Sequence, residues 1–341
     1  MSSIRSRALA NVTSYSVYIA EAAKHMPQRG SIHSVFNAAV NIVFPGIPQG
    51  TRKGYPYYDT PIPGIPQGTR KGYPYYDTPI PGGFVLSLNA ASTPRMPNGV
   101  QLSSPPGSFP FSALRVGMPV IFGAQRLHIE AIDCSLDLSQ SSQWNPHIQR
   151  PDQLDMAILQ KNYTRLKTIA EEWFHAARLP GRPRGSRRPP LPYTNLPAHV
   201  VYGRGTPRGY PDGPGHETDI LTLARHLCGR GIGLTPTGDD ILAGWMAAGW
   251  LLHGPEAGFV ETCQYIVEIA RQQTHLLSQC WLAHAAHGNV AEPIAALLYA
   301  MTCADDFQLE NAIKAVLAMG ATSGYDLIQG ILLACRMGYN E

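Results

Sequence analysis

Residues 228–254 read CGRGIGLTPTGDDILAGWMAAGWLLHG, and this stretch decides how the second half of the chain folds. Three glycines, at 229, 231 and 233, allow a tight loop, because glycine reaches backbone dihedrals that are closed to other residues. The apolar residues after Asp240 recur at helical spacing and predict a helix over residues 238–253. Thr237 and Asp240 have the spacing of a capping box, which predicts that Thr237 caps this helix. Such a loop suits a phosphate or a carboxylate, because the free N–H groups and the dipole of a helix start attract anions.

The same pattern occurs a second time near the C-terminus. Residues 237–244, TGDDILAG, and residues 323–330, SGYDLIQG, share a hydroxyl residue, Gly, any residue, Asp, two aliphatic residues, any residue and Gly. Each copy predicts a capped helix start with a small residue one turn further in, and the two starts are predicted to converge on one ligand. Two capped helices with a purely structural role are the alternative. Asp239 is not needed as a cap partner, which favours a site.

The C-terminal half is helical in pattern, whereas the N-terminal half is rich in short strands. Helices are predicted over residues 217–228, 238–253, 257–287, 291–302, 307–319 and 325–337, with glycines after several of them. Before residue 150, β-like runs at 84–88, 113–122 and 127–138 alternate with Gly, Pro and Ser clusters. The predicted fold class is therefore α+β. A β-rich subdomain (1–150; antiparallel sheet or small barrel) precedes a long helix (151–178), a Pro/Gly/Arg-rich connector (179–215) and a helical domain (216–341).

One segment of the N-terminal half is duplicated exactly. Residues 46–63, GIPQGTRKGYPYYDTPIP, are repeated without a change as residues 64–81. Prolines every few positions exclude a regular helix or an interior strand. Removal of both copies would join NIVFP to GGFVLSL, which reads as a strand, a turn and a strand. The 36 residues are therefore interpreted as an insertion in a hairpin loop, which exposed loops tolerate cheaply.

Composition narrows the class of protein. The formal net charge of +3 over 341 residues is too small to indicate nucleic-acid binding. The six cysteines form no CxxC pair and are typical of reduced core thiols. No apolar run is long enough to cross a membrane and no signal-peptide core is present, so a cytoplasmic protein without a membrane segment is expected. The charged fraction of 15% favours surfaces that are buried against other subunits.

Several familiar kinds of chemistry are not supported by the residue patterns. The Gly-rich run lacks the Lys-Ser/Thr pair of a P-loop, and no Ser or Cys lies in a nucleophile elbow. Three histidines at 275, 284 and 287 lack the glutamate of a zinc-protease helix, so no metal site is assigned. Asp239 and Asp240 offer the carboxylate oxygens that Mg²⁺ takes, so a shared magnesium ion stays open as a cofactor.

Residues 231–249, GIGLTPTGDDILAGWMAAG, resemble the GLTPSGDD signature of AllH-type subunits of oxamate carbamoyltransferase, a family long known as a domain of unknown function. The resemblance extends to residues 33–36 (HSVF), 97–99 (PNG), 274–298 and 320–326. It implies a subunit of a cytoplasmic multisubunit transferase of allantoin and purine breakdown. Such a complex moves a carbamoyl group between oxalurate, phosphate, carbamoyl phosphate and oxamate. The duplicated insert has no place in the family pattern, and Ile232 stands where proline is common.

The resemblance also implies a site at the two helix starts. It implies catalytic roles for Asp239, Asp240 and Asp326, and substrate binding by Gly233, Thr235, Thr237, Gly238, Thr322, Ser323 and Gly324. The backbone of residues 233–238 is expected to hold phosphate or carboxylate, Asp239 to orient an amide or take a proton, and Asp326 to complete the pocket. The expected partners are other carbamoyltransferase subunits and a small oxyacid or carbamoyl phosphate. A non-catalytic subunit that binds small anions or supports assembly is the alternative.

Overall fold

The computed structural model describes residues 11–24, 27–45, 83–103, 109–177, 220–231 and 233–338. The duplicated insert 46–81, the connector 179–215 and Ile232 lie outside these residues. The contacts between residues divide the chain into two compact units, of which the first ends at Pro146 and the second contains His147 and the helices that follow.

The first unit is a curled sheet in the form of a half-barrel. Its described strands are β1 (Val12–Ser16), β2 (Gln28–Val35), β3 (Ala39–Pro45), β4 (Gly83–Asn89), β5 (Gly99–Leu102), β6 (Pro119–Gly123), β7 (Arg126–Ile129), β8 (Cys134–Asp137) and β9 (Ser142–Trp144). They are ordered β8-β7-β6-β2-β3-β4-β5-β1-β9. Neighbouring strands run antiparallel except for the pairs β4–β5 and β1–β9, which are parallel.

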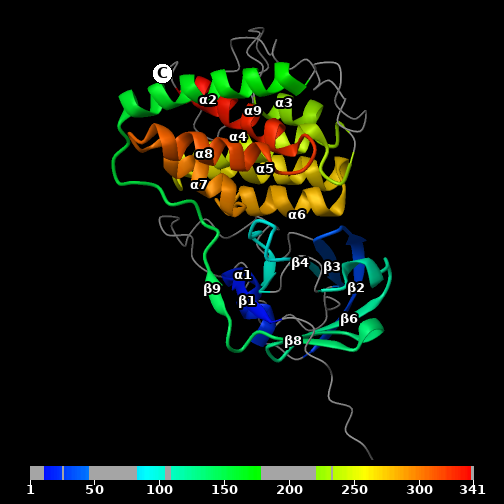
Figure 1. Ribbon diagram of the computed structural model, residues 1–341. Helices are drawn as coiled ribbons and strands as arrows, with labels where there is room; N and C mark the ends of the chain where they lie inside the picture. The colour runs from blue at the N-terminus through cyan, green and yellow to red at the C-terminus, as the bar shows by residue number, and fades with distance from the viewer. Residues whose placement is uncertain are drawn as a thin grey trace, which may run out of the picture. The chain divides into compact units, whose positions relative to one another are not determined.

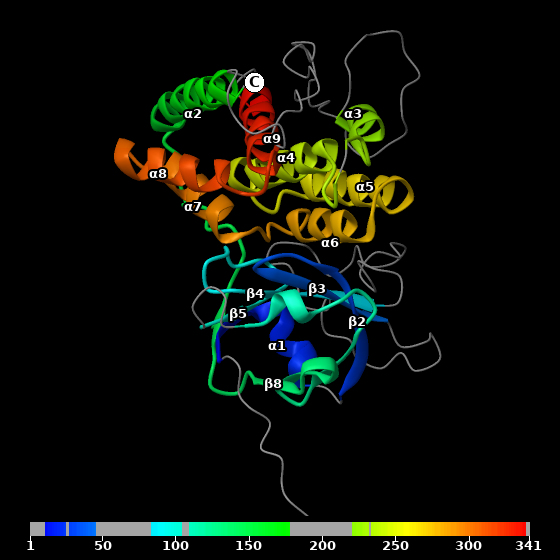
Figure 2. The same ribbon diagram turned by 45° about the vertical axis from the view of Figure 1, so that its right-hand side comes forward.

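Successive side chains along each strand point to opposite faces of this sheet, and one face is apolar while the other carries polar residues. In β3, Val40, Ile42 and Phe44 are fully buried in the hydrophobic core of the first unit, whereas Asn41 between them donates a hydrogen bond to Ser34 on the opposite face. Helix α1 (Val17–Lys24), which the sequence patterns did not predict, contributes Ile19 to the same core. Figure 2 shows α1 enclosed by the curl of the sheet.

The predicted strand pair around the duplicated insert is present. β3 and β4 pair antiparallel without interruption, from Ala39 opposite Asn89 to Pro45 opposite Gly83. The residues on either side of the insert therefore close a continuous hairpin ladder.

Two predicted strands are shorter than the sequence indicated. The run 113–122 becomes a strand only from Pro119, because a turn with Gly117 at a φ of 85° precedes it. The run 127–138 is a hairpin of β7 and β8 rather than one strand. A 3₁₀ turn, η5 (Glu130–Ile132), divides it and ends at Asp133, whose φ of 44° is left-handed. Left-handed residues reverse the chain, so neither run continues as one strand.

The second unit is helical. Its helices are α2 (Met156–Ala177), α3 (Ile220–Leu227), α4 (Thr237–His253), α5 (Ala257–Gln273), α6 (Leu276–Ala285), α7 (Glu292–Met301), α8 (Asp306–Leu317) and α9 (Ser323–Gly338). The single helix predicted over 257–287 is wrong, because the backbone of Thr274 is extended and separates α5 from α6. The Thr274 hydroxyl donates to the Asp239 carboxylate, so a contact with α4 determines this break.

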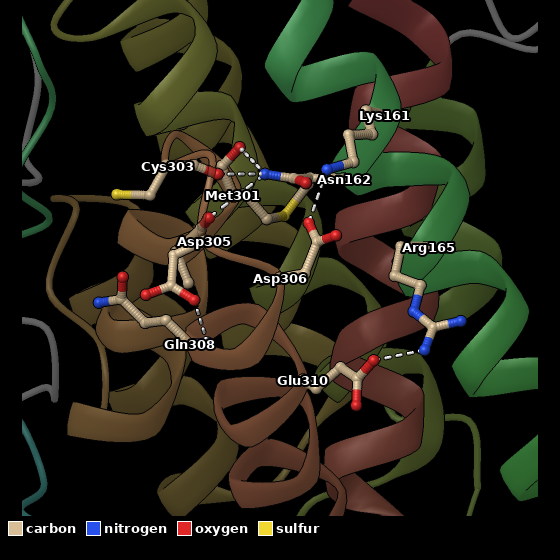
Figure 3. Close-up of polar contacts among 10 residues, drawn as sticks. Lys161, Asn162, Arg165, Met301, Cys303, Asp305, Asp306, Gln308 and Glu310 are labelled. Atoms are coloured by element: carbon tan, nitrogen blue, oxygen red, sulfur yellow. Dashed lines mark hydrogen bonds and ion pairs between the residues drawn. The ribbon is translucent and has the colours of Figure 1, made fainter.

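Helix α2 is fixed at its start by a cap and along its length by polar contacts. Asp155 Oδ1 accepts hydrogen bonds from the backbone N–H groups of residues 157 and 158, at 2.9 and 3.2 Å, so the helix begins later than residue 151. Asn162 of α2 is 1% exposed, and its amide lies within 3.4 Å of the carbonyls of Ala300, Met301 and Cys303 at the end of α7 (Figure 3). Figure 1 shows α2 lying along α8 and α9.

The predicted α+β class is confirmed by these two units, a strand-rich one followed by a helical one. All six cysteines are free thiols, and five of them are buried. Among the described residues, no helix combines the length and the apolar character that a membrane span requires.

Candidate functional site

The two copies of the repeated motif begin α4 and α9, and each follows a sharp turn. Gly229, Gly231 and Gly233 have φ values of 70°, 123° and 103° in the loop before α4. Gly320 has a φ of 59° between α8 and α9. These positive values require glycine, because a side chain would be strained there.

The first glycine of each motif seats its helix against the helix before it. A Cβ atom at Gly238 would lie 2.0 Å from the carbonyl oxygen of Leu227, near the end of α3. A Cβ atom at Gly324 would lie 1.8 Å from the carbonyl oxygen of Val316, near the end of α8. The pairs α3–α4 and α8–α9 are therefore built in the same way, as two copies of one helix–turn–helix unit.

The second glycine of each motif allows the backbones of α4 and α9 to pack closely against each other. A Cβ atom at Gly244 would lie 2.0 Å from the carbonyl oxygen of Leu327, and one at Gly330 would lie 1.9 Å from that of Ile241. Leu327 and Ile241 occupy the same position in their motifs. The contact is therefore reciprocal, and the two helices are related by a local two-fold axis that brings both helix starts together.

Two buried carboxyl groups lie where the helix starts meet. Asp240 is 5% exposed and Asp326 is 2% exposed, and they hold equivalent positions in the two motifs. In each of them the oxygen Oδ2 is buried and has no hydrogen-bond partner among the described residues. Unsatisfied buried polar atoms are rare and costly, so this pair is a feature that needs an explanation.

The environment of these groups favours their protonated forms. Burial raises the pKa of Asp326 to about 6, against hydrogen bonds from the hydroxyls of Thr237 and Thr322. Burial also raises the pKa of Asp240 well above its usual value, and hydrogen bonds from Ser323 and Thr235 act against this increase, while the Asp326 charge adds to it.

The hydroxyl contacts correct the predicted capping box. Pro236, not Thr237, is the N-cap of α4, and no side chain caps that helix. The Thr237 hydroxyl of α4 bonds to Asp326 of α9, and the Ser323 hydroxyl of α9 bonds to Asp240 of α4. Each motif thus supplies the hydroxyl for the carboxyl group of the other. The prediction failed because the spacing of Thr237 and Asp240 indicates only a contact within one helix.

Four hydroxyl groups form a half-buried layer beside the two carboxyl groups. Thr235, Thr237, Thr322 and Ser323 are each intermediate in exposure. Thr235 Oγ1 and Ser323 Oγ lie 3.2 Å apart, within hydrogen-bond distance. Gly233, on the same loop, is exposed, and its nearest neighbour would lie 4.0 Å from an added Cβ atom. A side chain at Gly233 would therefore meet open space.

Asp239 is engaged within the protein. Its Oδ1 accepts a hydrogen bond of 2.8 Å from the Gly229 backbone, and its Oδ2 accepts one from the Thr274 hydroxyl. Burial raises its pKa, while the hydrogen bonds from Thr274, Gly229 and Ser278 lower it. The carboxylate thereby joins the Gly-rich loop to the α5–α6 junction. The sequence patterns did not assign this role to Thr274, although it begins the stretch 274–298 that carries the resemblance.

The backbone N–H groups at both helix starts also have partners. Gly238 donates to the carbonyl of Arg230 at 2.9 Å, and Asp239 donates to Pro236 at 2.9 Å. In the second motif, Gly324 donates to Met319 at 3.1 Å. These three N–H groups are therefore engaged within the protein, and the half-buried hydroxyls are further donors at the junction.

A metal centre is not apparent in the described part of the chain. No group of three or more His, Cys, Asp or Glu side chains is arranged there to hold a metal ion. The magnesium ion considered for Asp239 and Asp240 would have to displace the hydrogen bonds of Asp239 to Gly229 and Thr274.

Comparison with known proteins places this site within a recognised family region. Residues 227–335 match the family model described as oxamate carbamoyltransferase subunit AllH. The match covers both motifs and all of α4 to α8. No solved structure matches the chain. The resemblance to AllH-type subunits is thereby confirmed over residues 227–335, the region that contains both motifs.

Proposed function

We propose that this chain is a subunit of a carbamoyltransferase complex and that the junction of α4 and α9 contacts its substrate. The observation that carries the proposal is the pair Asp240 and Asp326, two buried carboxyl groups with unsatisfied oxygens at equivalent positions of a repeated motif. The name of the matching family supports both the reaction and the presence of partner subunits. The pathway that the resemblance implies is the breakdown of allantoin.

The proposed reaction transfers a carbamoyl group between oxalurate and phosphate. A phosphate oxygen attacks the carbamoyl carbon of oxalurate and forms a C–O bond, while the C–N bond to the oxamate nitrogen breaks. The products are carbamoyl phosphate and oxamate, and the departing nitrogen takes up one proton. No protein nucleophile is required, since positioning of the reactants and stabilisation of charge supply the catalysis.

The residues of the junction divide into two proposed roles. The hydroxyls of Thr235, Thr237, Thr322 and Ser323 hold the oxygens of a carboxylate or phosphate group on the half-buried side. Asp326, whose pKa of about 6 lies close to neutral pH, gives a proton to the departing nitrogen and shares that proton with Asp240 beside it. Asp239, Gly238 and Gly324 act by positioning the two helix starts, and Gly233 leaves the approach open.

A thermal-shift titration tests whether the junction binds a substrate. The purified chain is titrated with carbamoyl phosphate, phosphate, oxamate and oxalurate, each with and without Mg²⁺. We expect one of these ligands to raise the melting temperature by several degrees, because a ligand that binds only the folded state stabilises it. Asp240→Asn should abolish the shift, whereas Asp152→Asn, a change at an exposed carboxylate, should leave it unchanged.

Reconstitution with partner subunits separates this proposal from a role in assembly alone. If the junction takes part in the reaction, Asp240→Asn abolishes carbamoyl transfer while the complex still assembles at its normal stoichiometry. Unchanged transfer in that variant would make the junction structural and favour the alternative of a non-catalytic subunit.

A further inference from the structure

The orientation of the ligand follows from the atoms at the junction that lack partners. These atoms are Asp240 Oδ2 and Asp326 Oδ2, both buried. An ionised carboxylate oxygen only accepts hydrogen bonds, and a carboxyl group that shares a proton still keeps acceptor sites. A ligand group that donates hydrogen bonds supplies the partners that these acceptor sites lack.

An anion is the wrong partner for this end of the site. The Asp326 charge already raises the pKa of Asp240, and a further negative charge beside these carboxyl groups would add to that repulsion. A metal ion would need further ligands, and the described residues place no third acidic, histidine or cysteine side chain in a suitable group. A neutral N–H donor satisfies both oxygens without an added charge.

The local two-fold relation between α4 and α9 indicates which kind of ligand group donates these hydrogen bonds. A primary amide nitrogen carries two coplanar N–H bonds that are related by the two-fold axis along its C–N bond. Asp240 and Asp326 are related by the same kind of symmetry, as the reciprocal contacts of Gly244 and Gly330 show. A primary amide nitrogen on that axis would present one N–H bond to each carboxyl group.

We infer that Asp240 and Asp326 bind the –NH₂ end of a primary amide or carbamoyl group, while the hydroxyls beside them hold the anionic end of the same molecule. This inference rests on the proposed function and adds the direction in which the ligand binds and the residues that hold each end. Substrates with a primary amide at one end and a carboxylate or phosphate at the other meet both halves of the site.

Three closely related ligands test the inference by isothermal titration of the full chain. Oxamate has both the amide and the carboxylate, oxalate replaces the amide by a second carboxylate, and N,N-dimethyloxamate lacks both N–H bonds. We expect oxamate to bind at least about tenfold more tightly than either of the others, because each unsatisfied buried oxygen penalises a ligand without donors. Binding to the dimethyl compound that equals that of oxamate would overturn the inference, as would the absence of saturable oxamate binding.

Two substitutions test the residues. Asp240→Asn and Asp326→Asn should each weaken oxamate binding by about tenfold or more and reduce the preference for oxamate over oxalate, since the repulsive charge is removed. Asp152→Asn should change neither quantity. Circular dichroism establishes that each variant is folded, and an unchanged preference in both folded variants would refute the assignment. Tight binding of Mg²⁺ alone that is lost in both variants would identify a cation site instead.

The outcome is independent of whether the complex performs carbamoyl transfer. If the reconstituted complex transfers carbamoyl groups but the chain does not prefer oxamate, only the orientation is wrong. If the preference for the amide is found but no transfer occurs with the partner subunits, the inference stands and the proposed reaction fails.

Discussion

Replacement of Asp326 by Asn should make the protein more stable above neutral pH. The carboxyl group is 2% exposed, and burial raises its pKa from 3.8 to about 6. The folded state therefore keeps a proton that the unfolded state loses, and ionisation of Asp326 inside the fold costs free energy. The contribution of Asp326 is most favourable below about pH 4 and is lost as the pH rises through about 6. Asn has nearly the same shape and does not ionise.

The size of the effect follows from the difference in pKa. A difference of about two pKa units corresponds to about 3 kcal/mol, at 1.36 kcal/mol per unit. Asn keeps one oxygen for the hydroxyls of Thr237 and Thr322, whose hydrogen bonds to the ionised carboxylate are already included in this difference. The variant should therefore gain about 3 kcal/mol in free energy of unfolding at about pH 8 and nothing below about pH 4.

Urea unfolding followed by tryptophan fluorescence measures this difference at a series of pH values in both proteins. Other carboxyl groups titrate in the same range, but they are present in both proteins, so the difference isolates Asp326 and its effect on Asp240. A variant that is less stable than the wild type at about pH 8, with the same pH dependence, would refute the reasoning. It would mean that Asp326 is ionised in the fold and stabilised by its partners.

Three further predictions, two of them with a control substitution, concern the packing around the junction, the support of α2 and the Gly-rich loop. Gly330→Ala should destabilise the protein by about 3 kcal/mol or more in urea unfolding, because the new Cβ atom would lie 1.9 Å from a carbonyl oxygen of α4. Gly258→Ala, an exposed helix position with no contact below 3.3 Å, should instead stabilise it by up to about 1 kcal/mol. Asn162→Ala should lower the free energy of unfolding by about 2–3 kcal/mol, because its buried amide donates hydrogen bonds to three carbonyls. Lys161→Ala removes an exposed ion pair and should lower it by under about 1 kcal/mol. Thr274→Val should cost about 1–3 kcal/mol and speed amide exchange in the Gly-rich loop, because a buried carboxylate loses its hydroxyl donor; an unchanged exchange rate would contradict the positioning role of that carboxylate.

Local patterns were sufficient for the elements but not for their ends. Helix α4 and the hairpin around residues 46–81 could be predicted, because glycine, proline and apolar spacing act over a few residues. Helix α1 was missed, since eight residues between two short runs carry little periodic signal. The break at Thr274 was missed as well, because it depends on a carboxylate 35 residues earlier in the chain.

The sequence by itself determined that two copies of one motif begin two helices. It also supplied the glycines and the carboxyl groups through which these two helices meet. Only the tertiary structure decided which hydroxyl serves which carboxyl group. The capping-box spacing pairs Thr237 with Asp240, whereas the packing of α4 on α9 pairs Thr237 with Asp326 and Ser323 with Asp240. The physical reason is that glycines 244 and 330 let the two backbones approach closely, so partners across the helix pair become nearer than partners along one helix. The same packing buries Asp240 and Asp326 together and leaves one oxygen of each without a partner.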